Sequence, residues 1–131
     1  MSGLAALLAG RSEPGAYLWH ATYDVDDVRH TVEAAGRPFA HVDGALVESV
    51  PELHGALAAA LGFPDWYGRN LDALADCLRD VPADTVLLWD AWAGAARAEP
   101  RVFKIAIGLL AARVSVLLRG PGPELGLPSL D

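Results

Sequence analysis

The sequence predicts an α/β fold in which a small, mostly parallel β-sheet packs against helices. Three observations favour this class. Short apolar strand patterns alternate with helical patterns along the chain, an order typical of parallel strands joined by helical crossovers. The 131 residues are 53 % apolar, enough for one core, and 21 % charged, which argues against disorder. No repeat, low-complexity tract or linker interrupts the chain, so we expect a single domain over residues 1–131.

The first part of the chain is expected to hold two strands and one helix after a short lead-in. Residues 1–16 predict a helical or irregular segment. Residues 17–23 are rich in β-forming side chains and predict a strand. Acidic cap residues and a following glycine bracket a helix over about residues 24–35. Residues 38–42 predict the second strand, because an Asp-Gly turn follows them directly.

The middle of the chain is expected to hold two helices separated by an aromatic loop. Ser49, with proline two residues later, is a typical helix start because its hydroxyl can cap the first turn. Gly62 ends this helix. Residues 63–69 form the loop Phe-Pro-Asp-Trp-Tyr-Gly-Arg. Asn70 is a good N-cap for the second helix, which extends to about Arg79.

The last part of the chain is expected to repeat the alternation of strands and helices. Residues 85–89 form a continuous apolar run of the buried-strand type. Residues 90–97 predict a short helix, and residues 100–112 predict a longer one that begins with proline. Residues 114–118 predict the last strand, and an irregular tail begins at Gly120.

The helix after Asn70 carries a column of carboxylates. Asp72, Asp76 and Asp80 recur every four residues, and like charges at this spacing repel each other by a few tenths of a kcal/mol per pair. The column therefore gains from meeting cations. A solvated acidic face is the alternative, and charge runs on helices are usually no more than that. A separate apolar stripe is expected to pack on the sheet and comprises Leu71, Leu74, Ala75 and Leu78.

Two aromatic residues, Trp66 and Tyr67, lie in the loop directly before this column. Exposed loop aromatics are typical binding anchors, whereas buried ones support the loop from beneath. We expect one of the two side chains to pack inward and the other to be available to a partner.

The run from Phe63 to Leu78 resembles the signature of the barstar family, intracellular inhibitors of secreted microbial ribonucleases. It combines proline, two aromatics, glycine, the Asn-Leu-Asp-Ala-Leu sequence and the Asp-Cys-Leu sequence in one block. The likeness extends more weakly over residues 38–118. It leaves out an N-terminal extension, residues 1–36, and a tail, residues 120–131. The resemblance implies a sheet of three parallel strands packed against helices, to which the extension could add a fourth.

The resemblance also implies a mechanism of active-site blockage. Asp76 matches the family's aspartate that occupies the place of a substrate phosphate, and Asp72 matches one that pairs with further cations or polar groups. Trp66 matches an aromatic residue that covers the catalytic histidine of the enzyme. The implied partner-binding residues are Trp66, Tyr67, Gly68, Asn70, Leu71, Asp72, Ala75, Asp76, Arg79 and Asp80. The expected partner is a secreted guanyl-type ribonuclease, bound one to one.

Two positions depart from barstar itself. Ala75 stands where barstar has tryptophan. Barstar also has a contacting glutamate in its last helix, whereas residues 101–112 contain no carboxylate and carry the cations Arg101 and Lys104. We expect a different cognate ribonuclease, such as one with a less basic rim, or alternatively a toxin that is not a ribonuclease, and inhibition of barnase itself is left open.

The composition excludes several other classes of function. A formal net charge of −7 argues against nucleic acid and favours a cationic partner or simple solubility. The single cysteine, Cys77, excludes an internal disulfide and is expected to be a buried filler. No apolar run is long enough to span a membrane and the start is a poor signal peptide, so a cytoplasmic protein is expected.

We also expect no catalytic activity, metal or cofactor. The four histidines (His20, His30, His41 and His54) lack metal-ligand spacing with one another or with Cys77. Asp72 and Asp76 could act as a general acid/base pair, but no second polar cluster or small-molecule substrate platform accompanies them. The alternative function is a non-inhibitory binding or regulatory module that reuses the fold, centred on Trp92 or on the N-terminal extension.

Overall fold

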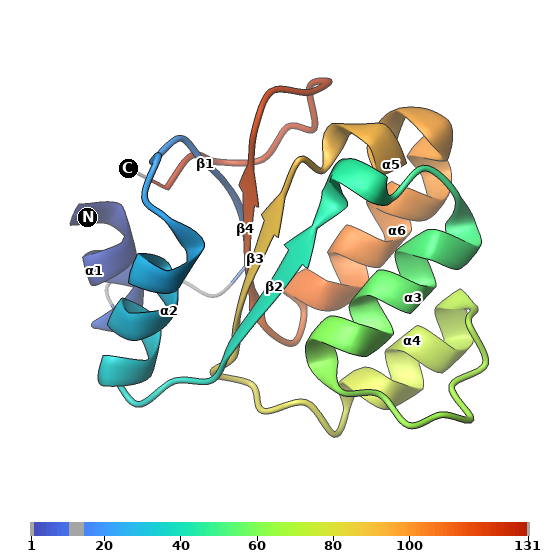
Figure 1. Ribbon diagram of the computed structural model, residues 1–131, viewed down its shortest axis with the longest axis horizontal. Helices are drawn as coiled ribbons and strands as arrows, with labels where there is room; N and C mark the ends of the chain where they lie inside the picture. Colours follow the sequence, from blue (N-terminus) through green and yellow to red (C-terminus); the bar gives the residue numbers. More distant parts are fainter. Residues whose placement is uncertain (1, 11–14, 131) are drawn as a thin grey trace.

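The structure is a computed structural model that describes residues 2–10 and 15–130. Its centre is a four-stranded, all-parallel sheet with the strand order β1-β4-β3-β2 (Figure 1). The strands are β1 (Ala16–Trp19), β2 (Phe39–Asp43), β3 (Val86–Asp90) and β4 (Ser115–Arg119). The predicted α/β class is therefore confirmed. The three strands implied by the resemblance are joined by a fourth from the N-terminal extension.

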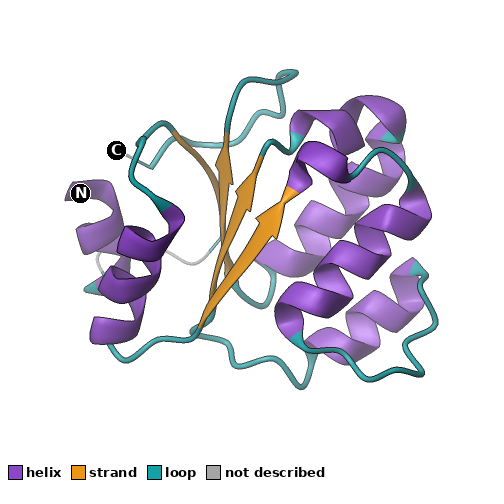
Figure 2. Ribbon diagram, viewed as in Figure 1, coloured by secondary structure: helices purple, strands orange, loops and turns teal. Residues whose placement is uncertain are grey.

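Helices cover both faces of this sheet (Figures 1 and 2). One face carries α1 (Ser2–Leu8) and α2 (Val25–Ala34). The other face carries α3 (Val50–Leu61), α4 (Leu71–Leu78), α5 (Ala93–Ala98) and α6 (Pro100–Ala111). A short 3-10 helix, η1 (Gly44–Leu46), follows β2. None of the helices in the described part of the chain has the length and apolar character needed to cross a membrane.

Successive side chains of the central strands enter two separate hydrophobic cores. In β3, Leu87 and Trp89 point into the core beneath α3–α6, whereas Val86 and Leu88 point into the core beneath α1 and α2. This alternation follows from the two-residue period of a strand. Because both faces are covered, β3 is buried throughout its apolar part, as the continuous apolar run predicts.

The C-terminal segment protects the open edge of the sheet. The amide of Leu18 in β1 donates to the carbonyl of Pro128 at 2.9 Å, and the amide of Leu130 donates to the carbonyl of Leu18 at 2.8 Å. Edge strands left unpaired invite association with other chains. The tail that sequence analysis described as irregular therefore closes the β1 edge with a short parallel bridge.

Most helix and strand boundaries predicted from capping residues, glycines and apolar runs lie within two residues of those in the structure. The hydroxyl of Ser49 accepts a hydrogen bond from the amide of Glu52 at 3.2 Å, and Gly62 ends α3 at φ 70°. The expected strand over residues 17–23 is wrong at its end, because β1 stops at Trp19. Its partner β4 ends at Arg119, which lies opposite Trp19 in the register.

Candidate functional site

The loop before α4 is shaped by a side-chain cap. The side-chain oxygen of Asn70 accepts a hydrogen bond from the amide of Ala73 at 2.8 Å, and its side-chain nitrogen donates to the carbonyl of Gly68 at 3.3 Å. Arg69 between them adopts φ 51°, a left-handed conformation that is uncommon for residues other than glycine. Asn70 thus fixes both the first turn of the helix and the preceding loop.

The buried side of α4 differs from the predicted stripe. Leu74, Cys77 and Leu78 are buried, whereas Leu71 and Ala75 are only half-buried. Leu74 and Leu78 belong to the core that lies between these helices and the sheet, while α4 as a whole packs chiefly against α6. The predicted burial of Cys77 is confirmed.

Arg113, which follows α6, holds the C-terminal end of α4. Its guanidinium donates to the carbonyl of Val81 at 2.7 Å and to the carbonyl of Arg79 at 3.1 Å. Both ends of α4 are therefore fixed by side-chain hydrogen bonds. The helix is a rigid support for whatever its outer surface presents.

Two carboxylates of the predicted column, Asp72 and Asp76, lie on α4, and the third, Asp80, lies in the turn just beyond its end. Asp72, Asp76 and Asp80 are all exposed. The Asp76 side chain is 68 % exposed, and its carboxylate lies 3.4 Å from a guanidinium nitrogen of Arg79, which is itself 78 % exposed. Such an exposed pair contributes little stability. The Asp76 carboxylate therefore remains available to a cation of a partner.

The two loop aromatics take opposite roles, as expected. Trp66 is 81 % exposed and has no ring contact with any other described aromatic residue. Tyr67 is buried, packs against Phe63 with 4.9 Å between ring centroids, and forms a 2.6 Å hydrogen bond between its hydroxyl and Nδ1 of His54. The Tyr67 side chain therefore supports the loop and cannot offer contact surface. Trp66 stands on the surface of the loop that precedes α4.

The Tyr67–His54 pair is uncharged at neutral pH. Burial raises the pKa of Tyr67 to about 12, with a smaller contribution from Cys77 that exceeds the opposing effect of Arg69. Burial and the nearby Arg69 guanidinium lower the pKa of His54. The loop is thus anchored by a neutral hydrogen bond, which avoids the cost of an ion in the core.

Most of the predicted contact residues are at least partly exposed, in α4, in the loop before it or directly after it. The exposed residues are Trp66, Gly68, Asn70, Asp72, Asp76, Arg79 and Asp80, with Leu71 and Ala75 half-buried beside them. Beside Ala75, a shallow depression of about 250 Å³ opens between α4 and α6. An alternative binding module centred on Trp92 is wrong, because Trp92 is 1 % exposed and stacks on Phe103 in the core.

Two residues that support α4 and its loop lie far away in the sequence and could not be identified from it. His54 lies 13 residues before Tyr67, and Arg113 lies 34 residues after Arg79. Neither has a local signal in the sequence. The apolar setting of His54 within α3 is the single hint that it needs a buried partner.

A second polar cluster lies on the α2 face, at the carboxyl ends of the strands. Nε2 of His41 lies 2.9 Å from the Asp90 carboxylate, and Nε of Arg119 donates to the same carboxylate at 2.6 Å. Arg119 also donates to the backbone carbonyl of Tyr23 at 2.6 Å. Burial alone would raise the pKa of Asp90, but the hydrogen bonds from Arg119 and His41 outweigh it and lower the pKa. This cluster ties β2, β3 and β4 together.

No metal centre emerges from the part of the chain that the structure describes. No cluster of three or more histidine, cysteine, aspartate or glutamate residues there is arranged to hold an ion. What α4 and the loop before it can do chemically is to present fixed negative charge and an exposed aromatic ring.

Comparison with known families gives a match to the family described as "Barstar (barnase inhibitor)" over residues 37–119. This region runs from just before β2 to the end of β4 and includes α4 and its loop. A curated relative from Bacillus subtilis (strain 168), named "Putative ribonuclease inhibitor YrdF", is 51 % identical over 49 residues. The aligned segment covers 35 % of this chain and 54 % of that relative, so the chain spans about half of the relative's length.

Proposed function

The chain belongs to the barstar family, and from this premise we propose that it inhibits a secreted guanyl-type ribonuclease by covering the active site with α4. The observation that carries the proposal is the Asp76 carboxylate. It is 68 % exposed on a helix whose two ends are both fixed, with Asp72 one turn before it and Asp80 in the turn just after the helix.

A fixed carboxylate suits the active site of a ribonuclease. Such a site gathers cationic side chains to hold a phosphate, and a carboxylate can satisfy the same groups through charge-assisted hydrogen bonds. Because α4 is rigid, little conformational entropy is lost when the complex forms. The column of three carboxylates also speeds the encounter with a positively charged partner.

Trp66 supplies the apolar part of the proposed contact. A large aromatic side chain that is 81 % exposed in the loop before α4 can cover the catalytic histidine of the enzyme. Gly68, Asn70 and Leu71 contribute backbone contacts around it. Asp72, Arg79 and Asp80 meet polar groups at the periphery of the cleft.

The two departures from barstar bear on which enzyme is bound. The depression beside Ala75 can accept a side chain from the enzyme where barstar has its own tryptophan. The flanking helix α6 has no carboxylate over residues 101–112 and offers Arg101 near its start. We propose a one-to-one complex, formed inside the cell, with a ribonuclease whose rim near α6 is less basic than that of barnase.

The proposal is tested by substituting Asp76 and a matched aspartate on the other face of the sheet. Asp26 is the control, because it also pairs with an arginine three residues later and is 82 % exposed. The inhibition constant is measured against the ribonuclease captured from the culture supernatant of the source organism. Asp76→Ala is expected to weaken inhibition by about 30-fold or more, because it leaves buried cations of the enzyme unpaired.

The control Asp26→Ala is expected to inhibit as well as the unmodified chain. Raising the salt concentration should slow association of the unmodified chain with the enzyme. If Asp76→Ala inhibits as strongly as the parent, the proposed mechanism is wrong.

A further inference from the structure

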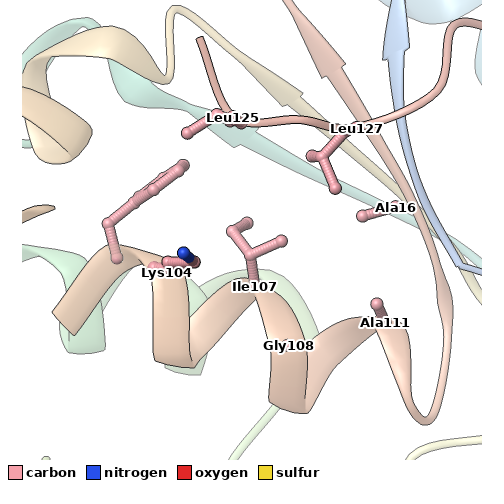
Figure 3. Close-up of a pocket in the computed structure, with 8 residues that line it drawn as sticks. Ala16, Lys104, Ile107, Gly108, Ala111, Leu125 and Leu127 are labelled. Atoms are coloured by element: carbon pink, nitrogen blue, oxygen red, sulfur yellow. The ribbon is translucent and has the colours of Figure 1, made fainter. Parts of the chain in front are cut away.

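A groove on the flank of α6 away from α4 has no role in the proposed inhibition. It lies between α6 and the C-terminal segment, above the start of β1 (Figure 3). In Figure 3, Ile107 of α6 and Leu127 of the C-terminal segment point toward one another across it. The groove encloses about 260 Å³. An apolar cavity of about 150 Å³ already holds benzene, so there is room here for a small organic ligand.

The lining of the groove is apolar except at one position. Phe103, Ile107, Ala111, Leu125 and Leu127 form most of its wall, and Lys104 is the single charged residue that lines it. Water bound there would find few hydrogen-bond partners. An apolar group is therefore the chemistry that the interior of the groove favours.

Gly108 lines the groove without a side chain, at the cost of helix stability. It lies within α6, where glycine is unfavourable relative to alanine. A Cβ atom at this position would meet no heavy atom within 4 Å, so packing does not require glycine. Because Gly108 lines the groove, a long side chain there can reach the space between α6 and the C-terminal segment.

Lys104 places a positive charge at one end of the groove. It is the chain's only lysine, and no carboxylate within the described residues forms an ion pair with it. Beyond Lys104 the groove continues into a second hollow of about 380 Å³, which shares Phe103, Lys104 and Leu125 and adds Arg97 and Glu124. The side-chain oxygen of Glu124 accepts a hydrogen bond from the amide of Gly126.

We propose that this groove binds a small carboxylate with an apolar tail, such as a medium-chain alkanoate. The tail lies over Gly108 between Ile107 and Leu127, and the carboxylate meets Lys104 at the junction of the two hollows. A neutral or cationic head group would leave Lys104 without a counter-charge. The site is separate from the acidic surface of α4, so it does not depend on any ribonuclease.

The test is a titration of the full chain with octanoate, followed by nuclear magnetic resonance. Saturable shifts are expected at the amides of Gly108, Ile107 and Leu127, with a dissociation constant of about 1 mM or tighter, as suits a ligand of this size. Octylamine has the same tail and the opposite charge. It is expected to bind at least about fivefold more weakly.

Three variants test whether octanoate binds in this groove. Gly108→Leu fills the space and is expected to abolish the saturable shifts, and circular dichroism checks that this variant remains folded. Lys104→Met is expected to weaken octanoate binding by about three- to fivefold, the size of a single exposed charge pair. Arg101→Met is the matched control, because Arg101 is an exposed cation of α6 that does not line the groove, and it should bind octanoate unchanged.

The proposal is overturned if octanoate produces no saturable shifts at Gly108. It is also overturned if Gly108→Leu or Lys104→Met binds octanoate as tightly as the unmodified chain, or if octylamine binds as tightly as octanoate.

Discussion

Two short acidic helices, α2 and α4, lie on opposite faces of the sheet and use their charges differently. In α2, Asp26 and Asp27 both lie in the first turn, where the helix dipole favours negative charge. Arg29 donates to Asp26 at 2.7 Å and also lies 5.2 Å above the ring of Phe39. The charges of α2 therefore serve its own fold.

The charges of α4 are placed less favourably for the helix itself. Only Asp72 lies in the first turn, whereas Asp76 and Asp80 follow toward the C-terminal end, where the dipole disfavours them. Arg79 approaches Asp76 only to 3.4 Å. Charges that do little for their own helix are available to a partner, and this difference between α4 and α2 fits the binding role proposed for α4.

The aromatic residues that precede the two helices differ in the same way: one packs within the fold and the other is left exposed. Tyr23, before α2, is 40 % exposed and rests on Trp19 with 6.3 Å between ring centroids. Trp66, before α4, is twice as exposed and lacks such a contact among the described aromatic residues. The largest difference between the two regions should appear when these aromatics are removed.

Trp66→Ala is expected to weaken binding to the ribonuclease by about 2–4 kcal/mol, as for an aromatic anchor at the centre of an interface. Its own unfolding free energy should stay unchanged, because Trp66 buries little surface in the free chain. Tyr23→Ala is expected to do the reverse, losing some stability while binding normally. Titration calorimetry and urea unfolding of both variants check this, and a Trp66→Ala variant that binds normally contradicts the division.

Tyr67→Phe is expected to lower the unfolding free energy by about 1–3 kcal/mol, because it leaves the buried Nδ1 of His54 without its partner. Binding should weaken less than in Trp66→Ala, since the Tyr67 side chain supports the loop from beneath. Urea unfolding measures the first effect. An unfolding free energy equal to that of the parent would mean that the hydrogen bond does not anchor the loop.

Sequence analysis predicted the fold where the signals were local. Ser49, Gly62 and Asn70 mark helix ends through their own side chains or backbone, and the ends of α3 and α4 fall where these residues predict them. The tertiary partners of α4 could not be predicted in this way. Ala75 and Cys77 are both small apolar residues, but Ala75 borders the depression between α4 and α6, whereas Cys77 lies near the buried Tyr67 of the loop and is itself buried.

The candidate site shows the same limit. The exposure of Asp72 and Asp76 follows from helical periodicity, but the choice between Trp66 and Tyr67 does not. That choice depends on His54, which packs beneath the loop from α3 and gives the Tyr67 hydroxyl a buried partner. A side chain's role is predictable when its partner is nearby in sequence, and unpredictable when the fold supplies the partner.

The two faces should also respond to acid in different pH ranges. On the α4 face, burial and Arg69 lower the pKa of His54 in the folded chain. As the pH falls, His54 therefore becomes protonated in the unfolded chain before it does in the folded chain. The contribution of His54 to stability is complete above about pH 6.5 and declines as the pH falls below it. On the α2 face, the lowered pKa of Asp90 gives a contribution that is complete above about pH 4 and is lost on further acidification.

Urea unfolding at a series of pH values separates these two steps. His54→Gln should flatten the dependence of the unfolding free energy on pH in the upper range and leave the lower range unchanged. Asp90→Asn should do the opposite. A single variant that removes both steps would show that the two faces titrate as one unit.

Removing one charge from each helix is expected to change the unfolding free energy least of all. It nevertheless tests most directly whether the charges of α2 stabilise their own helix and those of α4 do not. Asp80→Asn removes a negative charge from the unfavourable end of α4 and should raise the unfolding free energy by about 0.3–0.5 kcal/mol. Asp26→Asn removes a charge that the dipole and Arg29 both favour, and it should lower the unfolding free energy by a similar amount. Thermal unfolding at low salt gives the sign of each change, and both changes should shrink in high salt as the charges are screened. If the two substitutions shift stability in the same direction, the charges of α4 are no less favourable to their own helix than those of α2.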